Sequence, residues 1–535
     1  MMRLNTFRSI ASPEYPAQLS MLRMITLAIL LSLFAWQSHQ GLSLSDEGFL
    51  WYGAQRVLAG EVPIRDFFAY DIGRYYWSAA FMGLLGDTGI VALRVGLAIF
   101  QDVALVFGLR AILRSCSKQS TLFWIVALIT IAVWMTPQYR LIDLSLPVVL
   151  ISVLTYLAES PTYRRIFLAG FAVGMVAVFG RNHGLYGLVG SILVMLYLRW
   201  KAQSTFKLMP GFAIGAAGFA AGYLPVLLTL AFANGFAVAY WDGIKALFDF
   251  KATNLPLSVP WPWMVRFGEM PLGDAVRSVL IGWFFVADIV IGVLGIVWIG
   301  RQKMYGRAVP PVMVASIVLV LPYAHYAYSR ADIEHLALGA PPLLIFVFAS
   351  LTLLTGKIRW RAATLLFSAS VFVMLPLHPG WVCQASDKCV ETVVLGDKLT
   401  IHRDTAGILR ELGKLADQYS PGQQTFLVEP YWPGAYAALS RKAPMWDIYV
   451  SPYPRSTEFQ LTEIERIKRG NPGFVVIYDL PLDGREDLRF SRSHEVVDRY
   501  IRANFEFIDD PTRPSLLRIY RREWENPGDA DHPPI

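Results

Sequence analysis

The chain contains repeated apolar stretches, each close to the length that crosses a lipid bilayer as a helix. A transmembrane helix needs about 20 mainly apolar residues. We predict about eleven spans, and the stretches expected to form them are 21–38, 88–110, 119–136, 143–158, 166–181, 184–198, 208–232, 276–299, 309–328, 336–355 and 362–378. The shorter apolar stretch 75–86 is expected to be an interfacial or re-entrant helix. The pattern predicts a polytopic α-helical membrane protein.

Composition agrees with this prediction. Hydrophobic residues make up 55% of the chain and charged residues only 17%, whereas soluble domains carry about 25% charged residues. Such a sequence is neither a disordered chain nor a water-soluble globular protein. The chain has only 3 Cys, which argues against a small secreted protein held together by many disulfides.

Charge and hydropathy divide the chain near residue 378. Residues 1–377 hold 28 Lys and Arg against 17 Asp and Glu, whereas residues 378–535 hold 20 against 24 and lack long apolar stretches. We therefore expect a membrane domain over 1–377 and a soluble domain over 378–535. The basic excess lies in short connections between apolar segments, so it does not indicate a nucleic-acid partner.

The soluble part alternates between helical and strand patterns. We expect helices over 401–418, 457–469 and 493–504, and strands over 425–428, 474–478 and 516–520. Such alternation favours a layered α/β domain. The loop 429–434 is expected to be a rigid turn or, alternatively, a ligand contact.

The distribution of Lys and Arg predicts the orientation in the membrane. Alternate connections between the spans are basic, and with the N-terminal segment they contain Arg3, Arg8, Arg23, Arg110, Arg114, Lys118, Arg164, Arg165, Arg199, Lys201, Lys207, Arg301, Lys303, Arg307, Lys357, Arg359 and Arg361. Cytoplasmic connections are enriched in these residues. The N-terminus is therefore predicted to be cytoplasmic, and an odd number of spans places 378–535 outside. Cys383 and Cys389 would then lie in an oxidising compartment and could form a disulfide, whereas Cys116 should stay reduced.

The outer connections 39–87 and 233–275 are long, and long loops on a rigid scaffold often carry function. The first contains Asp46 and Glu47 at the start of a predicted helix over 47–59. Asp46 has two interpretations, because an Asp at this place can cap a helix or act on a substrate. Arg65 with Asp66, and Asp71 with Arg74, could simply pair with each other.

Further ionisable residues lie at the outer ends of predicted spans. They are Arg140, Arg181, His183, Arg330, Asp332 and His335. Charges near membrane depth usually face a cavity or a partner, although anchoring and helix capping are alternatives here. Because they recur on one side, we expect an outward-facing polar cavity above an apolar body. Asp102, Asp143 and Asp288 lie within spans and are expected to bond neighbouring helices.

An acidic pair just after the first span, followed by Pro63-Ile64-Arg65-Asp66-Phe67-Phe68 and Gly73, resembles the GT-C glycosyltransferases. The resemblance is strongest to the branch that contains the protein mannosyltransferases and the aminoarabinose transferase of lipid A. It covers the architecture of residues 20–377. The stretch 330–335 and the pair Pro341-Pro342 also look like a later outer-loop pattern of this family. The expected fold class is thus a GT-C-like membrane domain with a C-terminal soluble α/β domain.

The resemblance implies an enzyme that uses a polyprenyl-phosphate sugar on the outer face of the bacterial cytoplasmic membrane. Asp46 matches the catalytic Asp of the family, and Glu47 matches the acidic residue that accompanies it. A carboxylate can take the proton of an acceptor hydroxyl, and cations suit the departing phosphate. The candidate cations are Arg65, Arg74, Arg181, Lys245 and Arg330, and the other candidate substrate contacts are Asp66, Tyr70, Asp71, Arg140, His183, Asp332 and His335.

Carboxylates could hold Mg²⁺ or Mn²⁺, but no spacing in the sequence requires a metal or another cofactor. The expected reaction is an inverting transfer to a hydroxyl of a glycan, lipid or protein. Two alternatives stay open at this point. One is a transporter or flippase of lipid-linked saccharides, and the other is a polysaccharide polymerase or ligase with the same kind of lipid-linked substrate. The expected partners are the donor, the acceptor and the lipid bilayer.

Overall fold

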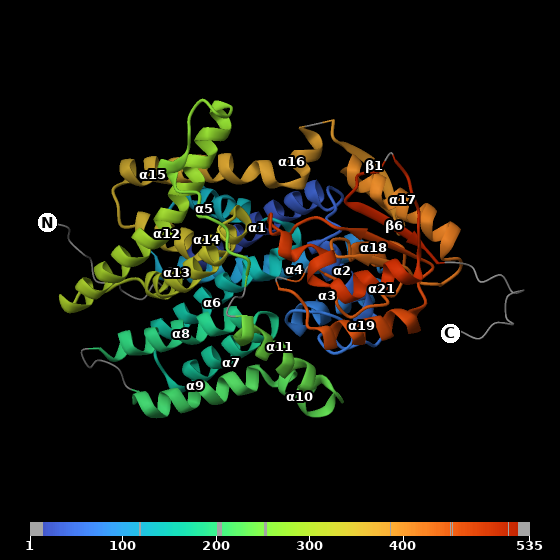
Figure 1. Ribbon diagram of the computed structural model, residues 1–535. Coiled ribbons are helices and arrows are strands. Elements are labelled where there is room, and N and C mark those ends of the chain that lie inside the picture. The colour runs from blue at the N-terminus through green and yellow to red at the C-terminus, as the bar shows by residue number, and fades with distance from the viewer. Residues whose placement is uncertain are drawn as a thin grey trace, which may run out of the picture.

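The structure is a computed structural model that describes residues 14–116, 119–200, 206–250, 254–385, 387–449, 451, 453–511 and 513–522. Four residues used in the orientation argument, Arg3, Arg8, Lys118 and Lys201, lie outside the described residues. Figure 1 shows a bundle of helices with the C-terminal region, coloured orange and red, packed against one end of it.

A helix is present at every predicted span. These helices are α1 (Glu14–Gln37), α4 (Ile90–Ser115), α5 (Thr121–Val133), α6 (Leu141–Glu159), α7 (Tyr163–Phe179), α8 (Arg181–Arg199), α9 (Leu208–Gly222) with α10 (Leu224–Phe232), α12 (Leu272–Met304), α13 (Pro311–Ser329), α14 (Ile333–Leu351) and α15 (Gly356–Met374). Their positions follow from the apolar stretches, because a bilayer leaves a helix as the local way to satisfy every backbone hydrogen bond.

Within the described residues, seven helices are long and apolar enough to cross a membrane, and the pair α9–α10, bent by 58°, would make an eighth. The remaining predicted spans coincide with α5, α7 and α8, which do not meet that criterion; α5 has 13 residues and α7 has 17. The chain is a multi-pass membrane protein by this measure. The total of about eleven spans stays a prediction.

Small residues let two of these helices approach closely. A Cβ atom added at Gly170 of α7 would lie 2.1 Å from the carbonyl oxygen of Gly215 in α9, and one added at Gly222 would lie 2.0 Å from the oxygen of Phe171. Glycine at such positions permits the backbone contact that drives helix association in membranes. The pair α7–α9 is therefore packed backbone to backbone.

The connections that were predicted to lie outside form short helices. They are α2 (Asp46–Leu58), α3 (Ile72–Leu85), η1 (Gln138–Arg140), α11 (Phe236–Phe250) and η2 (Pro262–Met264). The helices α2 and α3 correspond to the two helices predicted in the first outer loop. Figure 1 shows both of them lying between the bundle and the C-terminal region. That position brings the first outer loop into contact with residues several hundred positions later.

The C-terminal region contains a hairpin, a four-stranded sheet and short helices. Its elements are η3 (Leu375–Leu377), α16 (Pro379–Gln384), β1 (Cys389–Val394), β2 (Asp397–His402), α17 (Arg403–Tyr419), β3 (Leu427–Glu429), α18 (Gly434–Ala438), α19 (Thr457–Gly470), β4 (Phe474–Tyr478), η4 (Glu486–Leu488), α20 (Phe490–Ser493), α21 (Glu495–Asn504), β5 (Glu506–Phe507) and β6 (Leu517–Arg521). The sheet order is β3-β4-β6-β5, with β3 parallel to β4 and the other pairs antiparallel.

The predicted strands and helices of this region are present, but the hairpin β1–β2 was not expected. Its turn places Leu395 at φ 48° and Gly396 at φ 86°, and two residues with positive φ are typical of a tight hairpin turn. A Leu at the first turn position hides this hairpin from sequence patterns.

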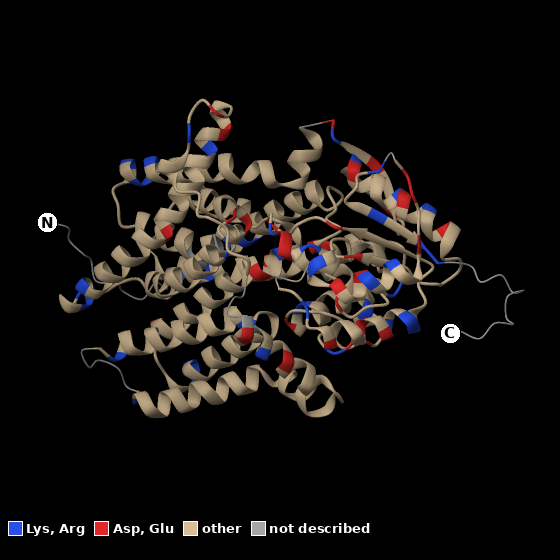
Figure 2. Ribbon diagram, viewed as in Figure 1, with Lys and Arg blue, Asp and Glu red and all other residues tan. Residues whose placement is uncertain are grey.

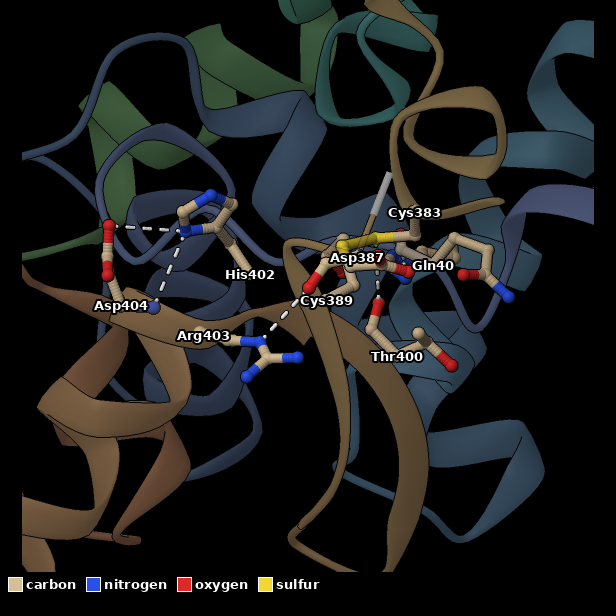
Figure 3. Close-up of a disulfide and its surroundings, with 10 residues drawn as sticks. Gln40, Cys383, Asp387, Cys389, Thr400, His402, Arg403 and Asp404 are labelled. Carbon is tan, nitrogen blue, oxygen red and sulfur yellow. Dashed lines mark hydrogen bonds and ion pairs between the residues drawn. A yellow bond between two sulfur atoms is a disulfide. The ribbon is translucent and has the colours of Figure 1, made fainter. Parts of the chain in front are cut away.

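The expected disulfide between Cys383 and Cys389 is present, and Figure 3 shows it beside Thr400 of β2. Thr400 also bonds the start of the first outer loop: its N–H donates to the oxygen of His39 at 2.8 Å, and its oxygen accepts from Gly41 at 2.9 Å. Cys116 is free and buried. The hairpin therefore attaches the C-terminal region to the end of α1.

Charge is distributed unevenly over the molecule. Figure 2 shows few charged residues along the bundle helices and many in the C-terminal region. Lys and Arg mark the ends of α8, α12 and α15 that lie away from that region, as the alternation of basic connections requires. One hydrophobic cluster extends from the bundle into the C-terminal region, joining Trp51 to Tyr436 and Phe426.

Candidate functional site

Asp46 is the first residue of α2, and its carboxylate is turned toward the C-terminal region. Its side chain is 38% exposed. Oδ1 accepts a hydrogen bond of 2.8 Å from the hydroxyl of Tyr449 and lies 3.9 Å from a guanidinium nitrogen of Arg140. Ser45 is the N-cap residue, and within the described residues no backbone N–H donates to the Asp46 carboxylate. The structure thus contradicts the interpretation of Asp46 as a helix cap.

Arg140 lies between two partly exposed carboxylates from different helices. Its Nε is 3.6 Å from Oε2 of Glu334, in the first turn of α14, and Glu334 is 39% exposed. The Tyr139 hydroxyl donates to the same Oε2 at 3.0 Å. The cluster thus places two carboxylates, which can accept a proton, beside an arginine, which can bind a phosphate. Activation of a hydroxyl next to a phosphate needs both kinds of group.

Tyr449 is held against α2 by its ring as well as by its hydroxyl. The ring stacks on Phe49, with centroids 5.0 Å apart and an interplanar angle of 20°. Burial, followed by the nearby charge of Asp46, raises the pKa of Tyr449. The hydroxyl therefore keeps its proton and donates it in the hydrogen bond to Asp46.

Glu47, predicted to accompany Asp46 in catalysis, faces the protein interior instead. Its carboxylate oxygens each accept a hydrogen bond of 2.8 Å from Arg94 of α4, and the two side chains are only 4% and 3% exposed. Arg94 also donates to the carbonyl oxygens of Ser38, Gln40 and Gly41. This geometry makes Glu47 a structural residue, because a buried pair cannot meet a substrate.

The Arg65–Asp66 segment is paired with itself, which was the structural alternative. Arg65 binds both oxygens of Asp66, at 2.8 and 2.7 Å, and also donates to the carbonyl of Asn234 at 3.2 Å. Asp66 accepts in addition from the N–H of Val62 at 2.8 Å. Burial alone would raise the pKa of Asp66, but the bonds from Arg65 and Val62 lower it. These contacts shape the loop and leave no free guanidinium for a phosphate.

Asp71 pairs with Arg181 rather than with Arg74. Arg181 Nε lies 2.7 Å from Oδ1 of Asp71, and its guanidinium sits over the ring of Tyr240 on α11 at 5.5 Å. Tyr70 is one of the exposed aromatic residues, and its ring meets Phe49 edge-on at 5.2 Å. Among these residues, Tyr70 is the one open to a ligand near Asp46.

Arg74 and His183 belong to a buried network. Arg74 binds both oxygens of Asp143, at 3.0 and 2.9 Å, while His183 Nε2 lies 3.3 Å from Asp143. His183 Nδ1 is 2.7 Å from the hydroxyl of Tyr323. The network joins α3, α6, α8 and α13, as expected for Asp143. It places Arg74 and His183 in helix packing rather than in substrate contact.

Arg330, Asp332 and His335 also have structural partners. Arg330 pairs with Asp332 at 2.8 Å and, through its other nitrogens, with Asp483 of the C-terminal region. Asp332 caps α14 by accepting the N–H of His335 at 2.8 Å. Burial raises the pKa of Asp332, but the hydrogen bond and charge of His335 outweigh it and lower the pKa to about 2. The predicted phosphate contact of Arg330 is thus replaced by a bond between regions.

Lys245 lies on the exposed side of α11, and no described contact joins it to the cluster around Asp46. Within the described residues, no group of three or more His, Cys, Asp or Glu side chains is arranged to hold a metal ion. The cluster around Asp46 supplies two carboxylates, from Asp46 and Glu334. Metal dependence therefore stays an open prediction.

Three residues of the cluster were not among the predicted site residues. Glu334 lies within the stretch 330–335, but the sequence-based prediction assigned substrate contacts to Arg330, Asp332 and His335 instead. Tyr139 directly precedes Arg140, and an aromatic residue at the end of a predicted span carries no distinct signal in the sequence. Tyr449 lies in the C-terminal region, 403 positions from Asp46, and nothing in local sequence indicates that pairing.

Comparisons with known proteins agree with this architecture. The crystal structure of ArnT from Cupriavidus metallidurans bound to undecaprenyl phosphate is similar over 93% of this chain and 97% of that one, with 13% identity and a TM-score of 0.55. The same protein in the apo state gives 12% identity and a TM-score of 0.56 over the same shares. No family model matches the sequence, and no curated protein does.

At 12 to 13% identity, the similarity is one of fold. It extends over the membrane helices, the first outer loop and the C-terminal region, since nearly the whole of both chains is covered. ArnT is a lipid A aminoarabinose transferase with the GT-C fold. The fold expected from the acidic pair and the sequence that follows it is confirmed, and the chain has the GT-C fold.

Proposed function

We propose that this protein is a membrane-bound, inverting glycosyltransferase. It would move a sugar from a polyprenyl-phosphate donor to an acceptor hydroxyl of a glycan, lipid or protein. The observation that carries the proposal is the partly exposed Asp46 carboxylate, 3.9 Å from Arg140, in the first outer loop of a GT-C fold. The undecaprenyl phosphate bound to ArnT supports a lipid phosphate as the leaving group.

In the proposed reaction, the acceptor oxygen attacks the anomeric carbon while its proton passes to Asp46. The bond between that carbon and the phosphate oxygen breaks, and the polyprenyl phosphate leaves with the bonding electron pair. A single displacement of this kind inverts the anomeric centre. The carboxylate must lie within hydrogen-bond reach of the hydroxyl, and the exposed edge of Asp46 permits this.

Arg140 is the cation assigned to the departing phosphate, because it is closest to Asp46. A guanidinium can bind two phosphate oxygens at once. Glu334 Oε2 lies 3.6 Å from Nε of the same guanidinium and accepts a hydrogen bond of 3.0 Å from the Tyr139 hydroxyl. We further infer that the reaction takes place on the outer face of the bacterial cytoplasmic membrane, with the N-terminus inside.

The test measures release of polyprenyl phosphate by purified full-length protein in lipid nanodiscs, offered a panel of polyprenyl-phosphate sugars and acceptors. General-base help contributes about 10²–10⁴-fold, so Asp46→Asn should slow release by roughly that factor. Asn still accepts the Tyr449 hydrogen bond and should keep normal abundance. Asp404→Asn is the matched control, because that side chain is 85% exposed at the start of α17.

Two results would point to other functions. Movement of the intact donor across a vesicle membrane, without cleavage of the sugar–phosphate bond, indicates a transporter. Products that grow by repeated addition, or that carry a whole glycan, indicate a polymerase or a ligase. Turnover by Asp46→Asn at the wild-type rate would show that Asp46 does not act in catalysis.

A further inference from the structure

A segment of the C-terminal region, Ala443–Tyr449, lies across α2, and we call it the strap. At one end, the N–H of Ala443 donates to the hydroxyl of Tyr52 at 2.9 Å. At the other end, the Tyr449 ring stacks on Phe49 and its hydroxyl donates to Asp46. Residues 46, 49 and 52 are spaced by three and share one face of a helix. The strap therefore covers the face of α2 that carries Asp46.

The middle of the strap is bonded to the first outer loop. The Trp446 indole N–H donates to the carbonyl of Ile64 at 3.0 Å, and the carbonyl of Trp446 accepts from the N–H of Phe68 at 2.9 Å. The indole ring also meets Phe68 edge-on at 5.3 Å. The strap and the loop 62–68 thus hold each other in place.

Behind the strap, a buried polar network fixes its backbone to the C-terminal region. Glu463 accepts from the N–H groups of Trp446 and Asp447, at 2.7 and 3.3 Å. Asp447 is itself buried and pairs with Arg455 and with His494, whose Nε2 lies 3.2 Å away. Such a network leaves the strap little freedom, so the position of the Tyr449 hydroxyl is determined by the C-terminal region.

We propose that Tyr449 is a positioning residue for Asp46, and that the C-terminal region thereby completes the active site. This inference rests on the proposed function. Tyr449 occupies Oδ1, whereas Oδ2 has no hydrogen bond within the described part of the chain. The hydroxyl therefore fixes the carboxylate rotamer and leaves Oδ2 to receive the proton of the acceptor.

The hydrogen bond from Tyr449 is one of several polar contacts around the Asp46 carboxylate. Other titratable or charged groups act on Asp46 from the elements packed around it. They are Tyr70 of the first loop, Tyr139 and Arg140 of η1, and Glu334 of α14. None of these is altered in the variant described next.

The test compares Tyr449→Phe with wild type and with Tyr431→Phe. The first substitution removes the hydroxyl and keeps the ring on Phe49. The control removes a hydroxyl that donates to the carbonyl of Leu480 at 2.9 Å, also within the C-terminal region. We expect Tyr449→Phe to slow polyprenyl-phosphate release by about ten- to a hundredfold, as for loss of one hydrogen bond to a charged group.

A second readout separates positioning from mere attachment. Without the hydroxyl, Oδ2 is no longer held toward the acceptor, so kcat should fall while the donor KM stays unchanged. Tyr431→Phe should leave both kcat and the donor KM unchanged. Thermal unfolding of Tyr449→Phe, Asp46→Ala and the double variant measures whether the two side chains are coupled.

The outcomes are distinct. A wild-type protein that releases no polyprenyl phosphate from any donor overturns the proposed function and this role with it, even where the unfolding cycle shows coupling. An active wild type with an unchanged kcat in Tyr449→Phe overturns the positioning role alone. A slower Tyr449→Phe with a raised donor KM overturns it as well, because a displaced strap then explains the loss.

Discussion

Arg94 binds both carboxylate oxygens of Glu47 at 2.8 Å inside the protein, although Glu47 is adjacent to the half-exposed Asp46. Successive residues of a helix point about 100° apart, so one acid of the pair meets α4 and the other meets the C-terminal region. The pair therefore combines one structural and one candidate catalytic carboxylate.

We expect removal of the Glu47 side chain to lower the stability of the folded protein rather than to reduce only the rate of sugar transfer. Breaking a buried ion pair from one side costs about 3–5 kcal/mol, because the other charge is left without its partner. Glu47→Ala should lower the melting temperature and the abundance of the purified full chain, whereas Asp46→Asn should not. If Glu47→Ala were as stable as the wild type but inactive in sugar transfer, Glu47 would instead have a catalytic role.

Gly48 allows the C-terminal region to approach α2. A Cβ atom added there would lie 2.4 Å from the Cα of Gly434, a backbone atom that cannot yield without shifting its segment. We expect Gly48→Ala to lower thermal stability by several degrees and to expose the C-terminal region to limited proteolysis. Gly407→Ala in α17 is the control, since nothing lies within 4 Å of its added Cβ; equal effects in both variants would contradict this account.

Arg140 and Arg330 should behave differently when each is changed to Gln. Loss of a donor that stabilises transition-state charge costs about 10²–10³ in kcat, and we expect this of Arg140→Gln. Arg330→Gln breaks a partly exposed pair with Asp483, worth about 0–1 kcal/mol, and should leave donor KM unchanged. Steady-state kinetics of both variants test these two expectations. A raised donor KM in Arg330→Gln would support the predicted contact between Arg330 and the donor phosphate.

Glu429 should make stability depend on pH above the acidic range. Its carboxyl is buried, and Oε1 has no hydrogen-bond partner among the described residues. Burial, with the charges of Asp447 and Glu463, raises the pKa of Glu429 well above 4.5. The folded state therefore keeps a proton that the unfolded chain releases above pH about 4.3, and stability falls by about 1.4 kcal/mol per pH unit until the folded pKa is reached.

Melting temperatures of the full chain from pH 5 to 8 test this sign. The decline should be shallower in Glu429→Gln than in wild type, with the exposed Glu391→Gln as control. Asp447 does not contribute to the pH dependence of stability in this range. Arg455 and His494 outweigh its burial and lower the pKa of Asp447 to about 2, so its carboxylate is ionised in both the folded and the unfolded state. Parallel curves for wild type and Glu429→Gln would show that the Glu429 carboxyl is ionised in the folded protein.

The orientation is testable through reporters and thiols together. Fusions after Arg165 or Lys303 should report the cytoplasm, and a fusion after Lys398 should report the outside. Cys383 and Cys389 should resist alkylation in denaturant until a reductant is added, whereas Cys116 should react without one. The same compartment for Arg165 and Lys398, or free thiols at both Cys383 and Cys389, would refute the predicted topology.

Local patterns predicted much of the architecture. Each predicted span coincides with a helix because a long apolar stretch has few alternatives in a bilayer. Strand β4 was predicted at Phe474–Tyr478, where it occurs, because five consecutive apolar or aromatic residues suit a buried strand. The disulfide between Cys383 and Cys389 followed from short spacing and predicted compartment.

The candidate site was predicted only in part. Asp46 was named from its place after the first span and from the family resemblance, and Arg140 from its charge at the outer end of a span. The sequence could not separate Asp46 from Glu47, because the difference lies in which partner each meets, and Arg94 is 47 positions from Glu47.

Local sequence accounts for the set of helices, the composition of the C-terminal region and the chemical types of the acidic and basic residues in the outer loops. Which of these charges are paired, and which remain available to a ligand, depends on how distant segments pack together. An ion pair or hydrogen bond requires distances of a few ångströms between side chains, whereas local sequence constrains mainly neighbours within one or two helical turns. Tyr449 reaches Asp46 because the strap crosses α2, and no local pattern contains that crossing.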